Sequence, residues 1–241
     1  MKRIKKTTFR LALTTSICAL SLGLLSTPAA AAPGWSWNLS RDMLVGFPPN
    51  ATPNPPANPI NAWTFMESTL GGPSTLPKFG APGSCWGWAS STMACWYNPN
   101  SGFMGSPIVG LSPTTTTVLS CPQIPQTRGV PILHPGMSQD AIVRWKNPLP
   151  QVLDVQVLGR FTHIDPCGSG IADGVAWSVL DHFGSTLAFG TLQSNMSATN
   201  ETDVFSFVLT VNPNDDLFFV VNRVGNYYYD STELDVLIVA Q

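Results

Sequence analysis

Apolar and polar residues alternate in short segments from residue 139 to the C-terminal end of the chain. Alternation with a period of two over six to ten residues is typical of a β-strand with one buried face. The segments are 139–146, 152–165, 174–181, 203–211, 217–222 and 233–240. The alternate apolar positions, which we expect to face the core, are Ala141, Val143, Trp145, Leu153, Val155, Val157, Phe161, Val175, Trp177, Val179, Phe205, Phe207, Leu209, Val211, Leu217, Phe219, Val221, Leu234, Val236 and Ile238. The alternative for 173–184 is a short helix, which its β-branched residues and Gly184 disfavour.

Turn-forming residues separate these segments. The separating stretches are KNPLP, DPCGSG, DHFGS, NPNDD and VGNYYYDS, and the chain contains 22 prolines. Lysine and glutamate, the usual residues of surface helices, are scarce. We therefore predict an all-β fold, an antiparallel β-sandwich of jelly-roll-like arrangement, with the two apolar sheet faces forming the core.

The N-terminal residues have the pattern of a secretory signal peptide. A basic start is followed by an apolar run of about fifteen residues and by small residues, with cleavage expected after Ala31. Six prolines lie in 48–60 and indicate an extended arm. We therefore predict a signal peptide over 1–31, a Pro-rich arm over 32–60 and the sandwich domain over 61–241, in a secreted or periplasmic protein.

Net charge narrows the class of partner. The whole chain has 12 basic and 14 acidic residues, and five of the basic ones precede residue 32. Removal of the signal peptide would leave a net charge of −7. Such a charge is repelled by a phosphate backbone or an anionic lipid surface, so we expect neither a nucleic-acid partner nor membrane insertion.

Cysteine parity agrees with export. Cys18 would leave with the signal peptide, and four cysteines would remain: Cys85, Cys95, Cys121 and Cys167. Four cysteines allow three disulfide pairings, of which we favour Cys85–Cys95 and Cys121–Cys167 because the first pair is close in sequence. The paired Cys-x-x-Cys spacing of a zinc site is absent.

Two aromatic clusters are candidates for carbohydrate binding. They comprise Trp86, Trp88, Trp96, Tyr97 and Asn98 in the first, and Tyr227 and Tyr229 in the loop 223–232. Exposed indole or phenol rings stack on the C–H faces of sugars, while amide groups bond the hydroxyls. The alternative for the first cluster is a core corner closed by a disulfide, and exposed aromatic residues also serve protein interfaces.

No catalytic residue can be assigned from sequence motifs. A serine hydrolase elbow, Gly-x-Ser-x-Gly, is absent. A glycosidase would need two facing carboxylates, for which Asp154 and Asp181 are the better candidates.

No metal ligand or cofactor is assigned either, although a structural calcium ion is possible. Convergence of His163, Asp165 and His182 on a cation is not required by their spacing. Turn aspartates suit calcium better, and Asp165, Asp173 and Asp230 are the first to test.

Several segments resemble a family of exported bacterial domains found in proteins with a PEP-CTERM sorting tail. They are HPG (134–136), AIVRWKNP (141–148), VQVLGRFTHID (155–165), DGVAWSVL (173–180) and FFVVNRVGNYYYDSTELD (218–235). Those domains are similar in pattern to carbohydrate-binding-module jelly rolls. The resemblance implies an exported β-sandwich and no catalytic residues. This chain ends in LIVAQ rather than in a Pro-Glu-Pro motif, so sorting by that route is not implied.

The function expected from these features is non-catalytic binding of carbohydrate or another extracellular polymer. An envelope or host-contact adhesion component is the alternative, and a small secreted hydrolase is the second alternative.

Overall fold

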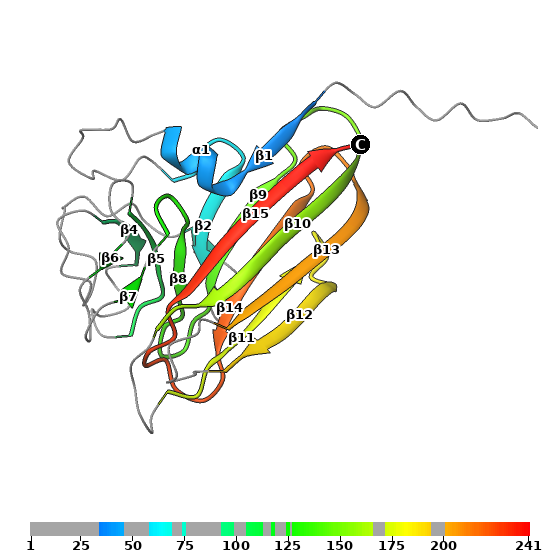
Figure 1. Ribbon diagram of the computed structural model, residues 1–241. Helices are drawn as coiled ribbons and strands as arrows, with labels where there is room; N and C mark the ends of the chain where they lie inside the picture. Colours follow the sequence, from blue (N-terminus) through cyan, green and yellow to red (C-terminus); the bar gives the residue numbers. More distant parts are fainter. Residues whose placement is uncertain are drawn as a thin grey trace, which may run out of the picture. The chain divides into compact units, whose positions relative to one another are not determined.

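The computed structural model describes residues 34–45, 58–68, 74–75, 93–98, 105–112, 117–118, 124–125, 127–165, 172–193 and 201–241. Within these ranges most residues lie in antiparallel strands of two sheets, and helix is confined to one short segment (Figure 1). The predicted all-β, antiparallel sandwich is therefore confirmed.

The first sheet, sheet A, contains the C-terminal strand. Its order is β13 (Thr202–Val211), β10 (Leu153–His163), β15 (Thr232–Ala240), β8 (Ile132–His134), β5 (Ile108–Leu111) and β4 (Ala94–Tyr97), with β1 (Ser36–Asn38) also paired to β15. Sheet B has the order β12 (Thr186–Leu192), β11 (Val175–Leu180), β14 (Asp216–Arg223), β9 (Ala141–Lys146), β2 (Trp63–Glu67) and β3 (Ser74–Thr75). Strands β6 (Thr117–Val118) and β7 (Ile124–Pro125) form a separate pair.

Burial follows the alternation along each long strand. In β10, Val155 and Val157 are buried between the sheets, while Asp154 between Leu153 and Val155 is exposed. All the predicted core positions are buried except Phe207 and Leu209, which are half-buried and pack on the core. Both residues belong to β13, the terminal strand of sheet A, where the core side chains are less fully buried. The segment 173–184 contains strand β11 and a turn, so the strand interpretation is confirmed.

Stacked aromatic rings join the two sheets near β13. Phe161 of sheet A stacks on Trp177 of sheet B with ring centroids 4.8 Å apart, and Phe205 lies 5.7 Å from each ring. Trp177 Nε1 donates a hydrogen bond of 2.9 Å to Asp203 Oδ2 on β13. This bond satisfies the polar atom of a buried indole and ties β13, the terminal strand of sheet A, to β11 of sheet B.

Glycine makes room for one of these rings. Gly159 lies directly opposite Phe205 in the β10–β13 register. A Cβ atom at residue 159 would overlap the Phe205 ring and approach the Asp235 carbonyl oxygen. The ring thus occupies the space of the missing side chain, which explains a glycine in the middle of a long strand.

Part of the segment predicted as an arm packs on the sandwich. Strand β1 adds to sheet A, and helix α1 (Leu39–Val45) follows it directly. Asn38 Oδ1 accepts a 2.7 Å hydrogen bond from the backbone N–H of Arg41, as an N-cap does. Asp42 of the helix accepts a 3.0 Å bond from Trp63 Nε1 of β2. These contacts attach the helix to the edge of the core.

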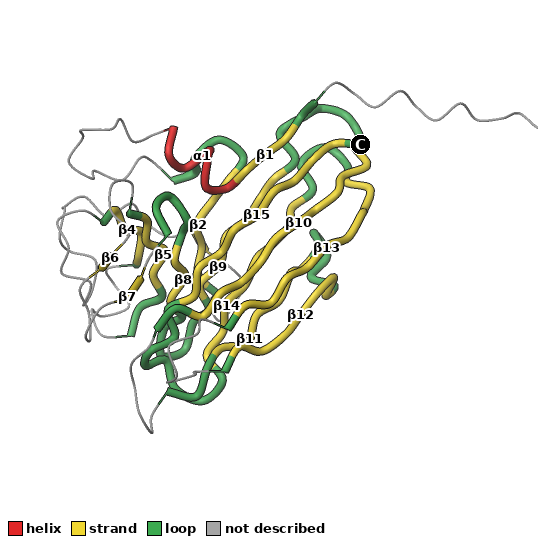
Figure 2. Tube along the Cα trace, viewed as in Figure 1, coloured by secondary structure: helices red, strands yellow, loops and turns green. Residues whose placement is uncertain are grey.

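Figure 2 shows that long turns gather at the two ends of the strands, where they leave the sheets. None of the helices in the described part of the chain is long and apolar enough to cross a membrane.

Candidate functional site

Two turns, one within a hairpin of sheet B and one crossing from sheet A to sheet B, meet at one end of the sandwich and form a pocket. The turn 181–185 joins β11 to β12, and the turn 212–215 joins β13 to β14. The pocket between them has a volume of about 230 Å³. Its lining residues are Asp181, His182, Phe183, Leu187, Leu209, Thr210, Val211, Asn212, Asp215, Asp216 and Leu217. Because ligand pockets of drug size span about 300–1,000 Å³, this one suits a single ring-sized group.

The first turn holds Phe183 out toward solvent. Asp181 Oδ1 accepts hydrogen bonds of 2.8 Å from the backbone N–H groups of both Phe183 and Ser185. Gly184 adopts a φ of +83°, a left-handed conformation that suits glycine. The Phe183 side chain is 85% exposed and makes an edge contact with the His182 ring, centroid to centroid 5.4 Å. The turn thereby presents an exposed aromatic ring at the rim of the pocket.

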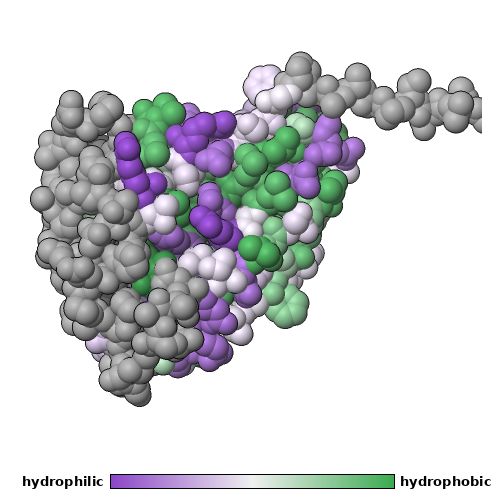
Figure 3. Space-filling model, viewed as in Figure 1, coloured by the Kyte–Doolittle hydropathy of each residue, from purple (hydrophilic) through white to green (hydrophobic). Residues whose placement is uncertain are grey.

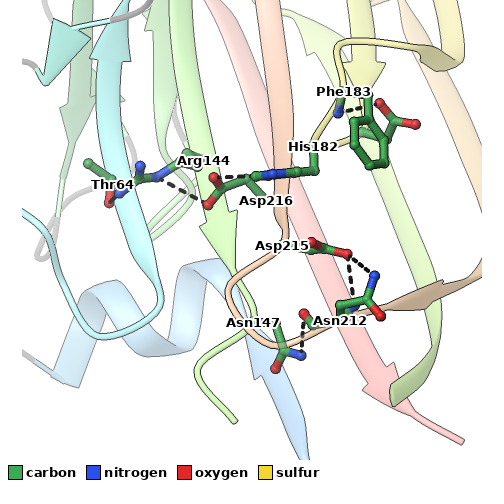
Figure 4. Close-up of polar contacts among 9 residues, drawn as sticks. Thr64, Arg144, Asn147, His182, Phe183, Asn212, Asp215 and Asp216 are labelled. Atoms are coloured by element: carbon green, nitrogen blue, oxygen red, sulfur yellow. Dashed lines mark hydrogen bonds and ion pairs between the residues drawn. The ribbon is translucent and has the colours of Figure 1, made fainter. Parts of the chain in front are cut away.

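The second turn is closed by Asp215. Its Oδ2 accepts hydrogen bonds from the backbone N–H and the side-chain amide of Asn212, at 2.8 and 2.9 Å. Asn147, which is buried, donates from Nδ2 to the Asn212 carbonyl oxygen at 2.9 Å and to the Gln151 carbonyl oxygen at 3.2 Å. The turn is therefore fixed from both sides, as Figure 4 shows.

Asp216 lies between two basic side chains. Figure 4 shows Arg144 on one side of its carboxylate and His182 on the other. Arg144 Nε is 3.7 Å from Oδ1, and His182 Nδ1 is 3.6 Å from Oδ2. Arg144 also donates to Thr64 Oγ1 at 3.0 Å, which orients its guanidinium along sheet B. The pocket thus combines hydrogen-bonding carboxylates and an imidazole with one exposed apolar ring.

The first predicted aromatic cluster lies elsewhere in the molecule. Trp96 is fully buried in β4, with its ring 4.6 Å from that of Phe65. Tyr97 is 8% exposed and belongs to a second apolar cluster on the outer face of sheet A. The side-chain amide of Asn98 donates to Glu67 Oε1 at 2.5 Å. A ligand would have to open the core to reach Trp96, and sugar binding by Trp96 and Tyr97 stays a prediction.

Other predicted residues lie outside the described part of the chain. They are Trp86, Trp88, Cys85, Cys121 and Cys167. Cys95 is buried in β4. The proposed pairings Cys85–Cys95 and Cys121–Cys167 therefore stay predictions.

The tyrosine loop, residues 223–232, lies at the end of the sandwich opposite the pocket. Strand β14 runs from Asp216 at the pocket to Arg223 at this loop, which is about 23 Å in extended chain. Tyr227 is 5% exposed and stacks on Tyr228, which is 45% exposed, with centroids 4.5 Å apart. Tyr229 is half-buried at a φ of 64°. The solvent-exposed ring of this loop is therefore that of Tyr228 rather than that of Tyr227.

The two histidines considered as metal ligands lie at opposite ends of the sandwich. His163 Nε2 donates to the Tyr229 carbonyl oxygen at 2.9 Å, so His163 lies at the tyrosine loop, far from His182. Burial lowers the pKa of His163. Because the two histidines occupy opposite ends, they do not share a cation or a catalytic cleft.

The two glycosidase candidates, Asp154 and Asp181, lie on different strands and turns. Asp154 lies on the exposed face of sheet A and accepts a hydrogen bond from Thr210 Oγ1 at 2.5 Å. Asp181 lies in the pocket, where both of its bonds close the turn. Both carboxylates thus accept hydrogen bonds within the fold, Asp154 from a residue that lines the pocket.

The pocket residues Phe183, Asn212 and Asp216 were not identified from the sequence, in which only Asp181 and His182 of these two turns were considered for a functional role. The only sign of the pocket in the sequence was the presence of two polar turns, DHFGS and NPNDD, each between two predicted strands. It could not indicate that the turns meet.

Comparison with solved structures finds similar folds at low identity. The CBM51 module of Clostridium perfringens GH95, in complex with methyl-galactose, covers 52% of this chain and 80% of its own, at 9% identity and a TM-score of 0.32. The K3 adhesin domain of Lys-gingipain from Porphyromonas gingivalis w83 covers 46% and 74%, at 9% identity and a TM-score of 0.33. A family 35 carbohydrate binding module from Clostridium thermocellum covers 41% and 69%, at 9% identity and a TM-score of 0.26.

No protein-family model and no curated protein matches the sequence. The resemblance to exported domains with a PEP-CTERM tail is therefore not shown. Structural similarity with TM-scores below 0.5 does not assign a ligand or an activity.

Proposed function

We propose that this protein is a secreted, non-catalytic β-sandwich that binds neutral carbohydrate in the pocket beside Phe183. The observation that carries the proposal is the placement of this ring. It is 85% exposed, it is held by the Asp181 turn, and it borders a pocket of polar groups. A ring of this kind can stack on the C–H face of a pyranose.

The polar groups supply the complementary hydrogen bonds. Ionised carboxylates accept hydrogen bonds from sugar hydroxyls, and His182 and Asn212 offer further polar atoms at the same pocket. Their own contacts within the turns hold them in place before a ligand arrives, which lowers the entropic cost of binding.

Charge favours a neutral ligand. Three carboxylates line the pocket, against His182 and the neighbouring Arg144. Like charges across a binding site cost free energy, so an anionic polysaccharide would be disfavoured. The excess of acidic over basic residues in the chain acts in the same direction.

Binding can be measured by affinity electrophoresis and calorimetry with soluble neutral glucans, mannans and galactans, and with polygalacturonate and alginate as anionic polymers. We expect retention on at least one neutral polymer. Phe183→Ala should weaken that binding about two- to tenfold, because an aromatic stacking contact contributes roughly 0.5–1.5 kcal/mol.

The matched control is Phe189→Ala. Phe189 is 79% exposed on β12 but does not line the pocket, so its removal should leave affinity unchanged. Equal affinity of the wild-type protein and the Phe183→Ala variant would refute the pocket as the site. Absence of binding to every polymer, with folded protein, would refute the function.

A second candidate function is protein interaction, as in an adhesion component, through β13. This strand of ten residues ends sheet A within the described residues, and it carries one charged side chain, Asp203. Val204 and Val208 are 78% and 64% exposed on it. Figure 3 shows apolar side chains among polar ones over the face formed by β15, β10 and β13. Long, weakly charged edges pair with further strands, so the occupant we infer is a second copy of this chain.

Light scattering coupled to size-exclusion chromatography tests this candidate. The wild-type protein should show a concentration-dependent dimer, and Val208→Lys should shift it at least tenfold toward monomer because a charge would be buried at the contact. A strictly monomeric wild-type protein at high concentration would exclude it.

A further inference from the structure

Three aspartates from separate parts of the chain meet at the tyrosine-loop end of the sandwich. Asp165 follows β10, Asp173 precedes β11, and Asp230 precedes β15. Asp230 is fully buried, and Asp173 and Asp165 both act electrostatically on it. These are the turn aspartates that the sequence suggested for calcium.

Within the described part of the chain, three of their oxygen atoms are buried and receive no hydrogen bond. They are both carboxylate oxygens of Asp230 and Oδ1 of Asp173. Asp173 Oδ2 accepts a 3.0 Å bond from the backbone N–H of Asn226, and Asp165 Oδ2 accepts a 3.0 Å bond from Ser231 Oγ. The side chains of Asp165 and Asp173 are thus held by the loop around Asp230, and no described residue donates a hydrogen bond to the Asp230 carboxylate.

Positive charge is deficient at this position. Arg223 is the cation that acts on Asp230, but its Nη1 donates to the Gly225 carbonyl oxygen. A buried carboxylate that lacks donors is stabilised by a proton or by a cation.

We propose that Asp173 and Asp230 bind a Ca²⁺ ion here, with both oxygens of Asp230 and Oδ1 of Asp173 as its protein ligands. The unpartnered atoms are all carboxylate oxygens, which are the ligands that calcium prefers. No group of three His, Cys, Asp or Glu side chains in the described residues is arranged to hold a metal ion by itself. Main-chain carbonyl oxygens and water therefore complete the coordination, and Asp165 contributes charge.

The bound ion would join two chain segments. Asp173 leads into β11, and Asp230 leads into β15 from the loop 224–231. Gly225 permits the close approach of this loop, because a Cβ atom at residue 225 would overlap Asp173 Oδ2. Binding should therefore stabilise the whole loop, including Tyr228.

The experiment uses the secreted protein after treatment with EDTA and dialysis at pH 7.5. We expect titration with CaCl₂ in a calorimeter to show one site, and 1 mM CaCl₂ to raise the melting temperature by roughly 4 °C or more above that in EDTA. MgCl₂ should give a smaller shift, because Mg²⁺ demands strict octahedral geometry.

Asp230→Asn and Asp173→Asn should each weaken Ca²⁺ binding at least tenfold. The matched control is Asp154→Asn, which removes an exposed carboxylate and should bind Ca²⁺ as the wild-type protein does. The proposal is overturned if the wild-type protein shows neither binding heat nor a melting shift. It is equally overturned if both loop variants keep wild-type affinity, since the ion would then lie elsewhere.

Discussion

Replacement of Trp177 by alanine is expected to lower the free energy of unfolding by about 3–5 kcal/mol, as for other buried tryptophans. Trp177 is 6% exposed, stacks on Phe161, and bonds Asp203 across the sandwich. The substitution would leave a cavity between the sheets and deprive Asp203 of its donor. Urea denaturation followed by circular dichroism measures the loss.

Two further variants separate packing from hydrogen bonding. Trp177→Phe keeps an apolar ring but removes Nε1–H, and it should cost about 1–2 kcal/mol. Trp35→Ala is the matched control, because Trp35 is 48% exposed and the change should fall within about 0.5 kcal/mol. A Trp177→Ala variant as stable as Trp35→Ala would show that the two sheets do not pack through this ring.

The second large effect is a change in the stability of the protein with pH. In calcium-free buffer, Asp230 should make the protein less stable as the pH rises from about 5 to 8. Burial first, and then Asp173 and Asp165, raises the pKa of this carboxyl to about 8 in the folded state, while Arg223 acts against the rise. In the unfolded chain the pKa of an aspartate is about 3.9.

The sign follows from proton binding. Below about pH 4 both states carry the proton, and the stabilisation from Asp230 is fully present. Between about pH 4 and 8 the unfolded chain has released the proton and the folded chain retains it, so this contribution falls by up to about 1.4 kcal/mol per pH unit. Above about pH 8 it is lost.

Comparison with the Asp230→Asn variant isolates the contribution of Asp230 to the pH dependence of stability. Burial also lowers the pKa of His134, to about 4, and that of His163, and it raises the pKa of Glu233, so the raw pH profile contains several contributions. The difference in unfolding free energy between the wild-type protein and Asp230→Asn removes them. Parallel profiles from pH 5 to 8 would show that Asp230 is not buried as a neutral acid.

The strands were predictable because burial between two sheets leaves a local trace in the sequence. Side chains of a strand alternate between faces, so Val155, Val157 and Phe219 were recognisable from their spacing alone. The end turns were recognisable for a similar reason, since Asp181 with Gly184 and Asn212 with Asp215 satisfy backbone groups within a few residues.

Ring exposure was less predictable. Tyr227 and Tyr228 are adjacent and chemically identical, and the structure buries one and exposes the other. Trp96 has polar neighbours in the sequence, yet Phe65 of the opposite sheet covers it. Exposure of a ring depends on what lies across from it, which spacing does not record.

The sequence by itself determined the alternating strands, the turns between them and the residues that fill the core, because these depend on contacts within a few positions. Only the tertiary structure decided which turns share an end. Pairing of β11 with β14 brings the His182 turn to Asp216, and the return of the chain to β15 brings Asp230 beside Asp173. The pocket and the acidic loop therefore arise from strand order, which depends on packing free energy summed over both sheets.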